Sequence, residues 1–143
     1  MTTAKEAVEA VHSAIRTNET RACRRAEAGK TVLHQGDVYL HAVPRTHDHG
    51  DALGTRQVAV GTTIGARHVA AGEAVTVYAG KKYPDYFRPP IDAGNELLGP
   101  LIIADGPWTL THPEHAHHEI HDTSVAWQVT YQYDRTTRRA VND

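Results

Sequence analysis

From residue 31 to residue 134 the chain consists of short β-like runs that glycines separate. The candidate strands are residues 37–43, 56–60, 68–71, 75–79, 97–104, 108–111 and 125–133. In the last run, Val125, Trp127 and Val129 alternate with smaller or polar residues, the period of two typical of a half-buried antiparallel strand. Because no helical pattern intervenes, the sequence predicts a mainly β domain, either an antiparallel sandwich or a partly closed barrel.

The N-terminal residues show a helical pattern instead. Thr3 followed by Glu6 matches a capping box, and Gly29 is a natural C-terminal stop. The stretch from residue 4 to residue 28 also has a thin apolar stripe, formed by Ala4, Val8, Val11, Ile15 and Ala22. We therefore expect one N-terminal α-helix, which packs on its own domain or on another subunit.

These patterns divide the chain into an N-terminal helix in residues 1–30, a β domain in residues 31–134 and a polar tail in residues 135–143. A long loop with three prolines, residues 81–96, interrupts the β domain. The loop contains three of the nine aromatic residues, Tyr83, Tyr86 and Phe87. Such rings either form a lip over a binding site or fold back to cover a core.

Composition narrows the possible partners and locations. The formal net charge is −2 at pH 7, so no basic surface for nucleic acid is indicated. Cys23 is the single cysteine, which rules out an intramolecular disulfide and fits a reducing, cytoplasmic location. No run approaches the ~18 apolar residues of a spanning helix, and the N-terminus lacks an apolar signal core. We therefore expect neither membrane insertion nor secretion.

The segment from His112 to His121 is the densest cluster of reactive side chains. It reads His-Pro-Glu-His-Ala-His-His-Glu-Ile-His, with five imidazoles and two carboxylates in ten residues. Imidazole is the commonest protein ligand for transition metals and titrates near neutrality. The segment therefore supports three interpretations: a metal site, a solvated or interface cluster that responds to pH, and catalytic proton transfer.

Known metal motifs fit this segment poorly. His118 and His121 are one residue too close for the His-Glu-x-x-His motif of a zinc protease helix. A cupin is disfavoured because no glycine and no histidine follow His121. In an extended strand, one face would carry His115, His117, Glu119 and His121. Residues i and i+4 of a strand are ~13 Å apart, so one straight strand cannot place all four around one ion. Ligands from elsewhere are then needed, and the candidates are His34, His41, His47, Asp48, His49 and His68.

Four short motifs resemble an uncharacterised family of small bacterial and phage-associated β proteins. They are Gln35-Gly36-Asp37-Val38, His112-Pro113-Glu114-His115, the closing strand Trp127-Gln128-Val129-Thr130-Tyr131-Gln132, and Gly65-Ala66-Arg67-His68. The last matches a Gly-His-x-His motif and keeps only its second histidine. The resemblance covers about residues 33–134 and implies no established activity. It does imply that His68, His112 and His115 lie together, with Glu114 beside them.

The expected function is a non-catalytic cytoplasmic or phage-associated binding and assembly module that forms a homo-oligomer. Its histidine cluster is expected to bind Zn²⁺, Ni²⁺ or Fe²⁺. The candidate metal ligands are His68, His112, Glu114, His115, His117 and His121. One alternative is a metal-dependent, hydrolytic enzyme in which Glu114 or Glu119 moves protons. The other alternative is a protein whose interface responds to pH.

Overall fold

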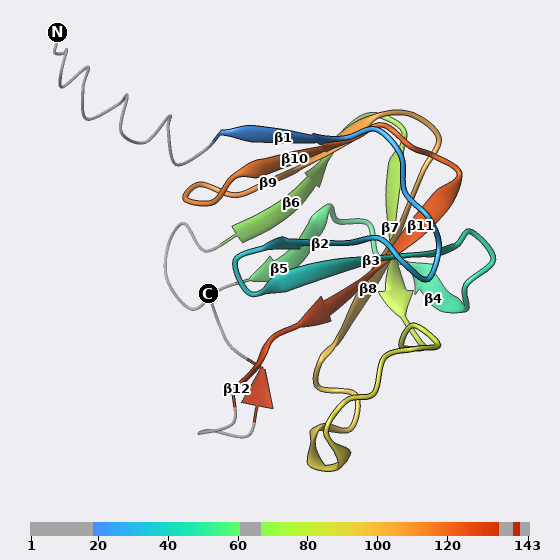
Figure 1. The fold of residues 1–143 in the computed structure, drawn as a ribbon, viewed down its shortest axis with the longest axis vertical. Helices are drawn as coiled ribbons and strands as arrows, with labels where there is room; N and C mark the ends of the chain where they lie inside the picture. Colours follow the sequence, from blue (N-terminus) through green and yellow to red (C-terminus); the bar gives the residue numbers. More distant parts are fainter. Residues whose placement is uncertain (1–18, 61–66, 135–138, 141–143) are drawn as a thin grey trace, which may run out of the picture.

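The computed structural model describes residues 19–60, 67–134 and 139–140. Two sheets account for most of them (Figure 1). The five-stranded sheet has the order β1 (Thr20–Cys23), β10 (His117–Ile120), β9 (Trp108–Thr111), β6 (Arg67–Ala71) and β5 (Gln57–Val60). The six-stranded sheet has the order β2 (Val32–Gln35), β3 (Val38–Pro44), β11 (Val125–Tyr131), β8 (Leu98–Ala104), β7 (Val75–Gly80) and β4 (His49–Ala52). Within these residues no barrel closes, so the architecture is a mainly β sandwich.

Hairpins build both sheets. The β2–β3 and β7–β8 hairpins belong to the six-stranded sheet, and the β5–β6 and β9–β10 hairpins belong to the five-stranded sheet. All neighbouring strands are antiparallel except β1 and β10, which pair in parallel. β11 lies between β3 and β8, and all its residues except Tyr131 are buried. The prediction of a mainly β, antiparallel domain is therefore confirmed.

One apolar core fills the space between the sheets. Leu40, Ile102 and Trp127 contribute from the six-stranded sheet and are at most 1% exposed. Leu110 and Ile120 contribute from the five-stranded sheet and are equally buried. These side chains occupy every second position of their strands, because alternate residues of a strand face the same side of a sheet.

The predicted N-terminal helix is wrong for residues 19–28. Residues 20–23 form β1, and residues 24–27 have no regular structure. The exposed edge of β10 explains the difference, since pairing with it satisfies backbone groups that a helix would bond internally. The Ala26 N–H also donates to the Asp122 carboxylate at 2.7 Å. The β fold thus begins ahead of residue 31, and residues 4–18 of the predicted helix lie outside the described residues.

The seven candidate strands all overlap strands of the structure, but the four remaining strands of the two sheets were not predicted. These are β1, β2, β4 and β10. In the predicted polar tail, β13 (Arg139–Ala140) pairs with β12 (Tyr133–Asp134). The remaining tail residues, 135–138 and 141–143, lie outside the described part of the chain.

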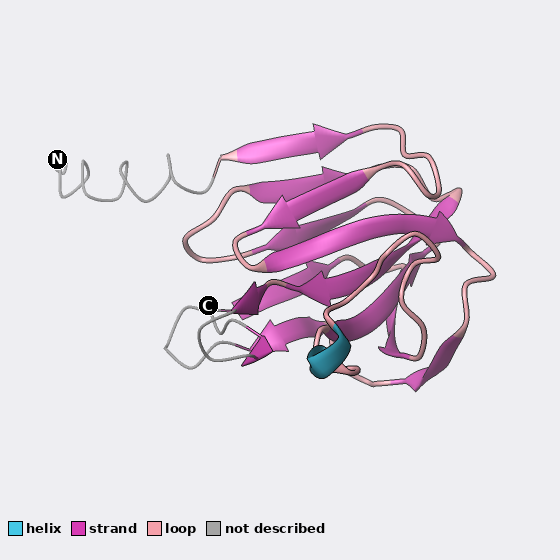
Figure 2. Cartoon of the chain, turned by 60° about the horizontal axis from the view of Figure 1, so that its bottom comes forward, coloured by secondary structure: helices cyan, strands magenta, loops and turns pink. Residues whose placement is uncertain are grey.

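The proline-rich loop contains the one helical turn among the described residues, the 3₁₀ helix η1 (Ile91–Ala93), seen in cyan in Figure 2. The loop lies against the outer face of the six-stranded sheet. Phe87 packs edge-on against His41 with ring centroids 5.5 Å apart, and Tyr83 stacks on Phe87 at 5.1 Å. No helix in the described residues is long and apolar enough to cross a membrane.

Candidate functional site

Three histidine rings lie side by side at one end of the sandwich. His68 and His112 occupy inward positions, because each is two residues from a core residue of its segment, Ala70 and Leu110. The ring centroids are 4.4 Å apart for His68 and His112, 4.4 Å for His112 and His115, and 6.4 Å for His68 and His115. The first two rings are each 1% exposed, whereas His115 is partly exposed. We call these residues the three-histidine cluster.

Gln35 determines the orientation of His68. The buried Gln35 amide donates from Nε2 to the carbonyl oxygens of Leu110, at 2.9 Å, and Ala116, at 2.8 Å. These two bonds leave Oε1 as the acceptor for His68 Nδ1, which lies 2.8 Å away. Neutral His68 therefore carries its proton on Nδ1 and its lone pair on Nε2, the nitrogen that a metal ion would bind.

His112 has the opposite tautomer. The Glu114 backbone N–H donates to His112 Nδ1 at 3.0 Å, so Nδ1 is an acceptor and the proton of the neutral ring is on Nε2. Metal binding through Nε2 would require that proton to leave and the turn at Glu114 to shift. In agreement with this, no group of three His, Cys, Asp or Glu side chains among the described residues has the geometry to hold an ion.

The other three predicted ligands do not join the cluster with their side chains. Glu114 is exposed, and its backbone contacts His112. His117 donates from Nε2 to the His112 carbonyl oxygen at 3.2 Å. His121 lies beyond the far end of β10 and pairs with Glu119 at 3.3 Å.

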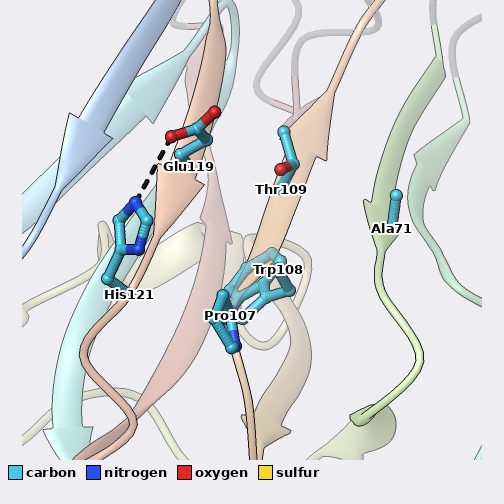
Figure 3. Close-up of a pocket in the computed structure, with 6 residues that line it drawn as sticks. All are labelled: Ala71, Pro107, Trp108, Thr109, Glu119 and His121. Carbon is cyan, nitrogen blue, oxygen red and sulfur yellow. Dashed lines mark hydrogen bonds and ion pairs between the residues drawn. The ribbon is translucent and has the colours of Figure 1, made fainter.

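His121 and Glu119 line a pocket of about 280 Å³ on the five-stranded sheet. Figure 3 shows them beside Thr109, with Ala71 on the neighbouring strand β6. Thr109 lies opposite both Glu119 and Ala71 in the strand register. This pocket therefore crosses three strands of one sheet and includes one imidazole and one carboxylate, fewer ligands than a specific transition-metal site needs.

The other candidate metal-binding histidines have partners in other parts of the molecule. His41 contacts the proline-rich loop. His47 donates from Nε2 to the Lys82 carbonyl oxygen at 2.8 Å, and the His49 ring packs on Tyr78 at 4.2 Å.

Two residues that organise this end of the sandwich were not among the predicted ligands. In the sequence, Gln35 stood out only as part of a motif, and His118 as one of the pair that fails the zinc-protease spacing. His118 is 6% exposed and donates from Nε2 to the His34 carbonyl oxygen at 2.8 Å. Strand alternation indicates that both residues face inward, since Leu33 and Ile120 lie two residues from them.

Acid is expected to destabilise the fold through His41 and His118. Burial lowers the pKa of His41 from 6.5 to about 4, and burial also lowers the pKa of His118. Below about pH 6.5 the unfolded chain therefore binds protons that the folded chain does not. The contribution of the buried neutral imidazoles to the free energy of unfolding is fully present above that pH and is lost as the pH falls toward 4. For His41 this loss is about 2 kcal/mol after allowance for partial solvation.

Urea unfolding of the wild-type chain and of His41→Gln at a series of pH values measures this effect. The variant is expected to lose less stability between pH 7.5 and pH 4 than the wild type does. An equally steep loss in the variant contradicts the assignment to His41.

A scan against protein-family models and searches of curated proteins and solved structures found no match to this chain. Function is therefore inferred from the site itself.

Proposed function

We propose that this chain is a non-catalytic binding and assembly module whose three-histidine cluster takes one divalent transition-metal ion. The orientation of His68 supports this most directly. Metal-binding histidines typically donate their second ring N–H to a protein acceptor, and the Gln35 amide is such an acceptor. The Nε2 lone pair of His68 is buried next to two further imidazoles.

The ligand set favours Zn²⁺, Ni²⁺ or Fe²⁺, since imidazole suits these ions better than Mg²⁺ or Ca²⁺. His68 is already in the ligand tautomer. His115 lies at the accessible side of the cluster, where an ion would enter. His112 would complete the set when its proton leaves Nε2 and the Glu114 turn shifts.

The positions of the two nearby carboxylates favour binding over hydrolysis. A hydrolytic metal site needs a group beside the ion that moves protons. The Glu114 side chain is exposed, and the Glu119 carboxylate pairs with His121 outside the cluster. We therefore place the metal-dependent enzyme second to the binding module.

The four edge strands of the two sheets support the assembly part of the proposal. β1 and β5 end the five-stranded sheet, and β2 and β4 end the six-stranded sheet. Each has four residues, and edge strands present backbone groups to which another chain can pair. Sedimentation near pH 5.5 and pH 7.5 separates the alternatives: a constant oligomeric mass favours a permanent homo-oligomer, and a changing mass favours a pH-responsive interface.

Metal titration of the untagged chain tests the site. Calorimetry with Zn²⁺ and Ni²⁺ is expected to show one ion per chain. His68→Gln removes the oriented lone pair and is expected to weaken binding by at least about tenfold. His121→Gln is the matched control, because it removes an imidazole of the same segment outside the cluster, and its affinity should equal that of the wild type.

Three outcomes contradict the metal proposal. They are the absence of saturable binding, unchanged affinity in His68→Gln, and an equal loss in both variants. Elemental analysis of the purified protein adds an independent measure of metal content.

A further inference from the structure

A second pocket lies on the six-stranded sheet, beneath the proline-rich loop. Its volume is about 380 Å³, within the range of about 300–1,000 Å³ that small-molecule sites occupy. Strands β2, β3 and β11 form its floor through Val32, His41 and Thr130, and the loop forms a wall through Phe87 and Pro90. We call it the loop pocket.

The walls of the loop pocket are aromatic and uncharged. Among the described residues, none that lines the pocket is Asp, Glu, Lys or Arg. Tyr39 and Phe87 provide ring surfaces, which favour planar ligands. Tyr39 and Gln132 add neutral groups that form hydrogen bonds. A charged ligand would lose its hydration in this pocket without gaining an opposite charge. A neutral ligand does not carry this cost of burying an unpaired charge.

His41 makes the floor both rigid and neutral. Its Nδ1 lies 2.5 Å from the Tyr86 hydroxyl, and its Nε2 lies 2.8 Å from Thr130 Oγ1. Burial lowers the pKa of His41 to about 4, so the ring is uncharged at neutral pH. Because both nitrogens already have partners, His41 serves as a positioning residue.

The loop wall is anchored by the same aromatic residues. The Tyr86 hydroxyl contacts His41, and Tyr83 stacks on Phe87 with an interplanar angle of 21°. The Tyr83 hydroxyl also donates to the Gly94 carbonyl oxygen at 2.9 Å, which ties the two arms of the loop together. The aromatic residues therefore cover the sheet and also leave a bounded space beside His41.

We propose that the loop pocket binds a small uncharged aromatic or heteroaromatic molecule of one or two rings. The ligand packs against Tyr39 and Phe87 and forms hydrogen bonds with the Tyr39 hydroxyl or Gln132. This site is on the six-stranded sheet, whereas His68 is on β6 of the five-stranded sheet and His112 follows β9, so either assignment can fail without the other.

The test uses three matched probes on the full chain: neutral indole, the anion indole-3-acetate and the cation tryptamine. Amide chemical shifts in two-dimensional NMR are recorded during each titration. Indole is expected to shift amides of β3, β11 and the loop in a saturable manner. The two charged probes should bind at least about tenfold more weakly, because their charge is buried without a partner.

Val32→Trp tests the location. Val32 is 43% exposed at the pocket, and an indole ring at this position would fill the space. The variant is expected to bind free indole at least about tenfold more weakly. Leu53→Trp is the matched control, because Leu53 is 47% exposed and does not line the pocket.

Four results overturn the proposal: no saturable shift with indole, shifts confined to other strands, equal binding of the charged probes, or undiminished binding in Val32→Trp. The wild-type shift map locates the site without any variant, so the test holds even if Val32→Trp fails to fold.

Discussion

Replacing Gln35 by Leu is expected to lower the free energy of unfolding by about 3 kcal/mol and to weaken metal binding by about tenfold or more. Gln35 is 2% exposed, and its amide bonds the His68 ring and two backbone carbonyls. Leucine has a similar volume and forms none of these bonds. The His68 N–H loses its acceptor in a buried site, and the 112–116 loop loses its tie to the β2–β3 turn.

Urea unfolding and zinc titration of the same variant measure the two effects. Gln57→Leu is the control, since Gln57 is a partly exposed residue of β5 and the same chemical change there should alter stability by less than about 0.5 kcal/mol. A loss below about 1 kcal/mol in Gln35→Leu would show that the His68 bond contributes little. Wild-type zinc affinity in a folded Gln35→Leu variant would show that Gln35 does not contribute to metal binding.

Replacing Gly80 by Ala is expected to destabilise the protein by about 3 kcal/mol. A Cβ at position 80 would overlap the backbone carbonyl of Gly99, directly across the β7–β8 pair. Both groups are backbone in paired strands, so rotation of a side chain cannot relieve the overlap. Gly99 cannot move away freely, because its own Cα faces Val129 and Tyr131 at close range.

Gly106→Ala is the matched control for Gly80→Ala. A Cβ at position 106 would meet Ala74 Cβ at 3.5 Å, an ordinary van der Waals contact. Its thermal midpoint should stay near the wild-type value, whereas that of Gly80→Ala should fall by about 10 °C or more for a chain of this size. Equal midpoints for the two variants would contradict close packing of β7 on β8.

Local sequence patterns predicted the strands that have one apolar face. Val125, Trp127 and Val129 alternate because one side of β11 faces the core between the sheets, and this alternation is visible without any knowledge of neighbouring strands. The strands that were not predicted lack this pattern. β4 contains one glycine and one aspartate in four residues, and β10 lies in the histidine-rich segment. They are strands because of the neighbours with which they pair.

β1 shows most clearly where local sequence patterns fail to predict the secondary structure. Its residues lie in the stretch whose capping signals and apolar stripe predict a helix, yet they pair with β10, about a hundred residues away in the sequence. Local propensity is worth at most about 1 kcal/mol per residue, and tertiary pairing outweighs it.

The sequence by itself determined the mainly β class and the segment in which most candidate metal ligands lie, because strand alternation and histidine density are local properties. Only the tertiary structure decided how these imidazoles are oriented and where their protons are. The Gln35 bonds that orient His68 span 75 and 81 residues to Leu110 and Ala116. Tautomers depend on such distant acceptors, and so the sequence could group His68, His112 and His115 but could not assign their lone pairs.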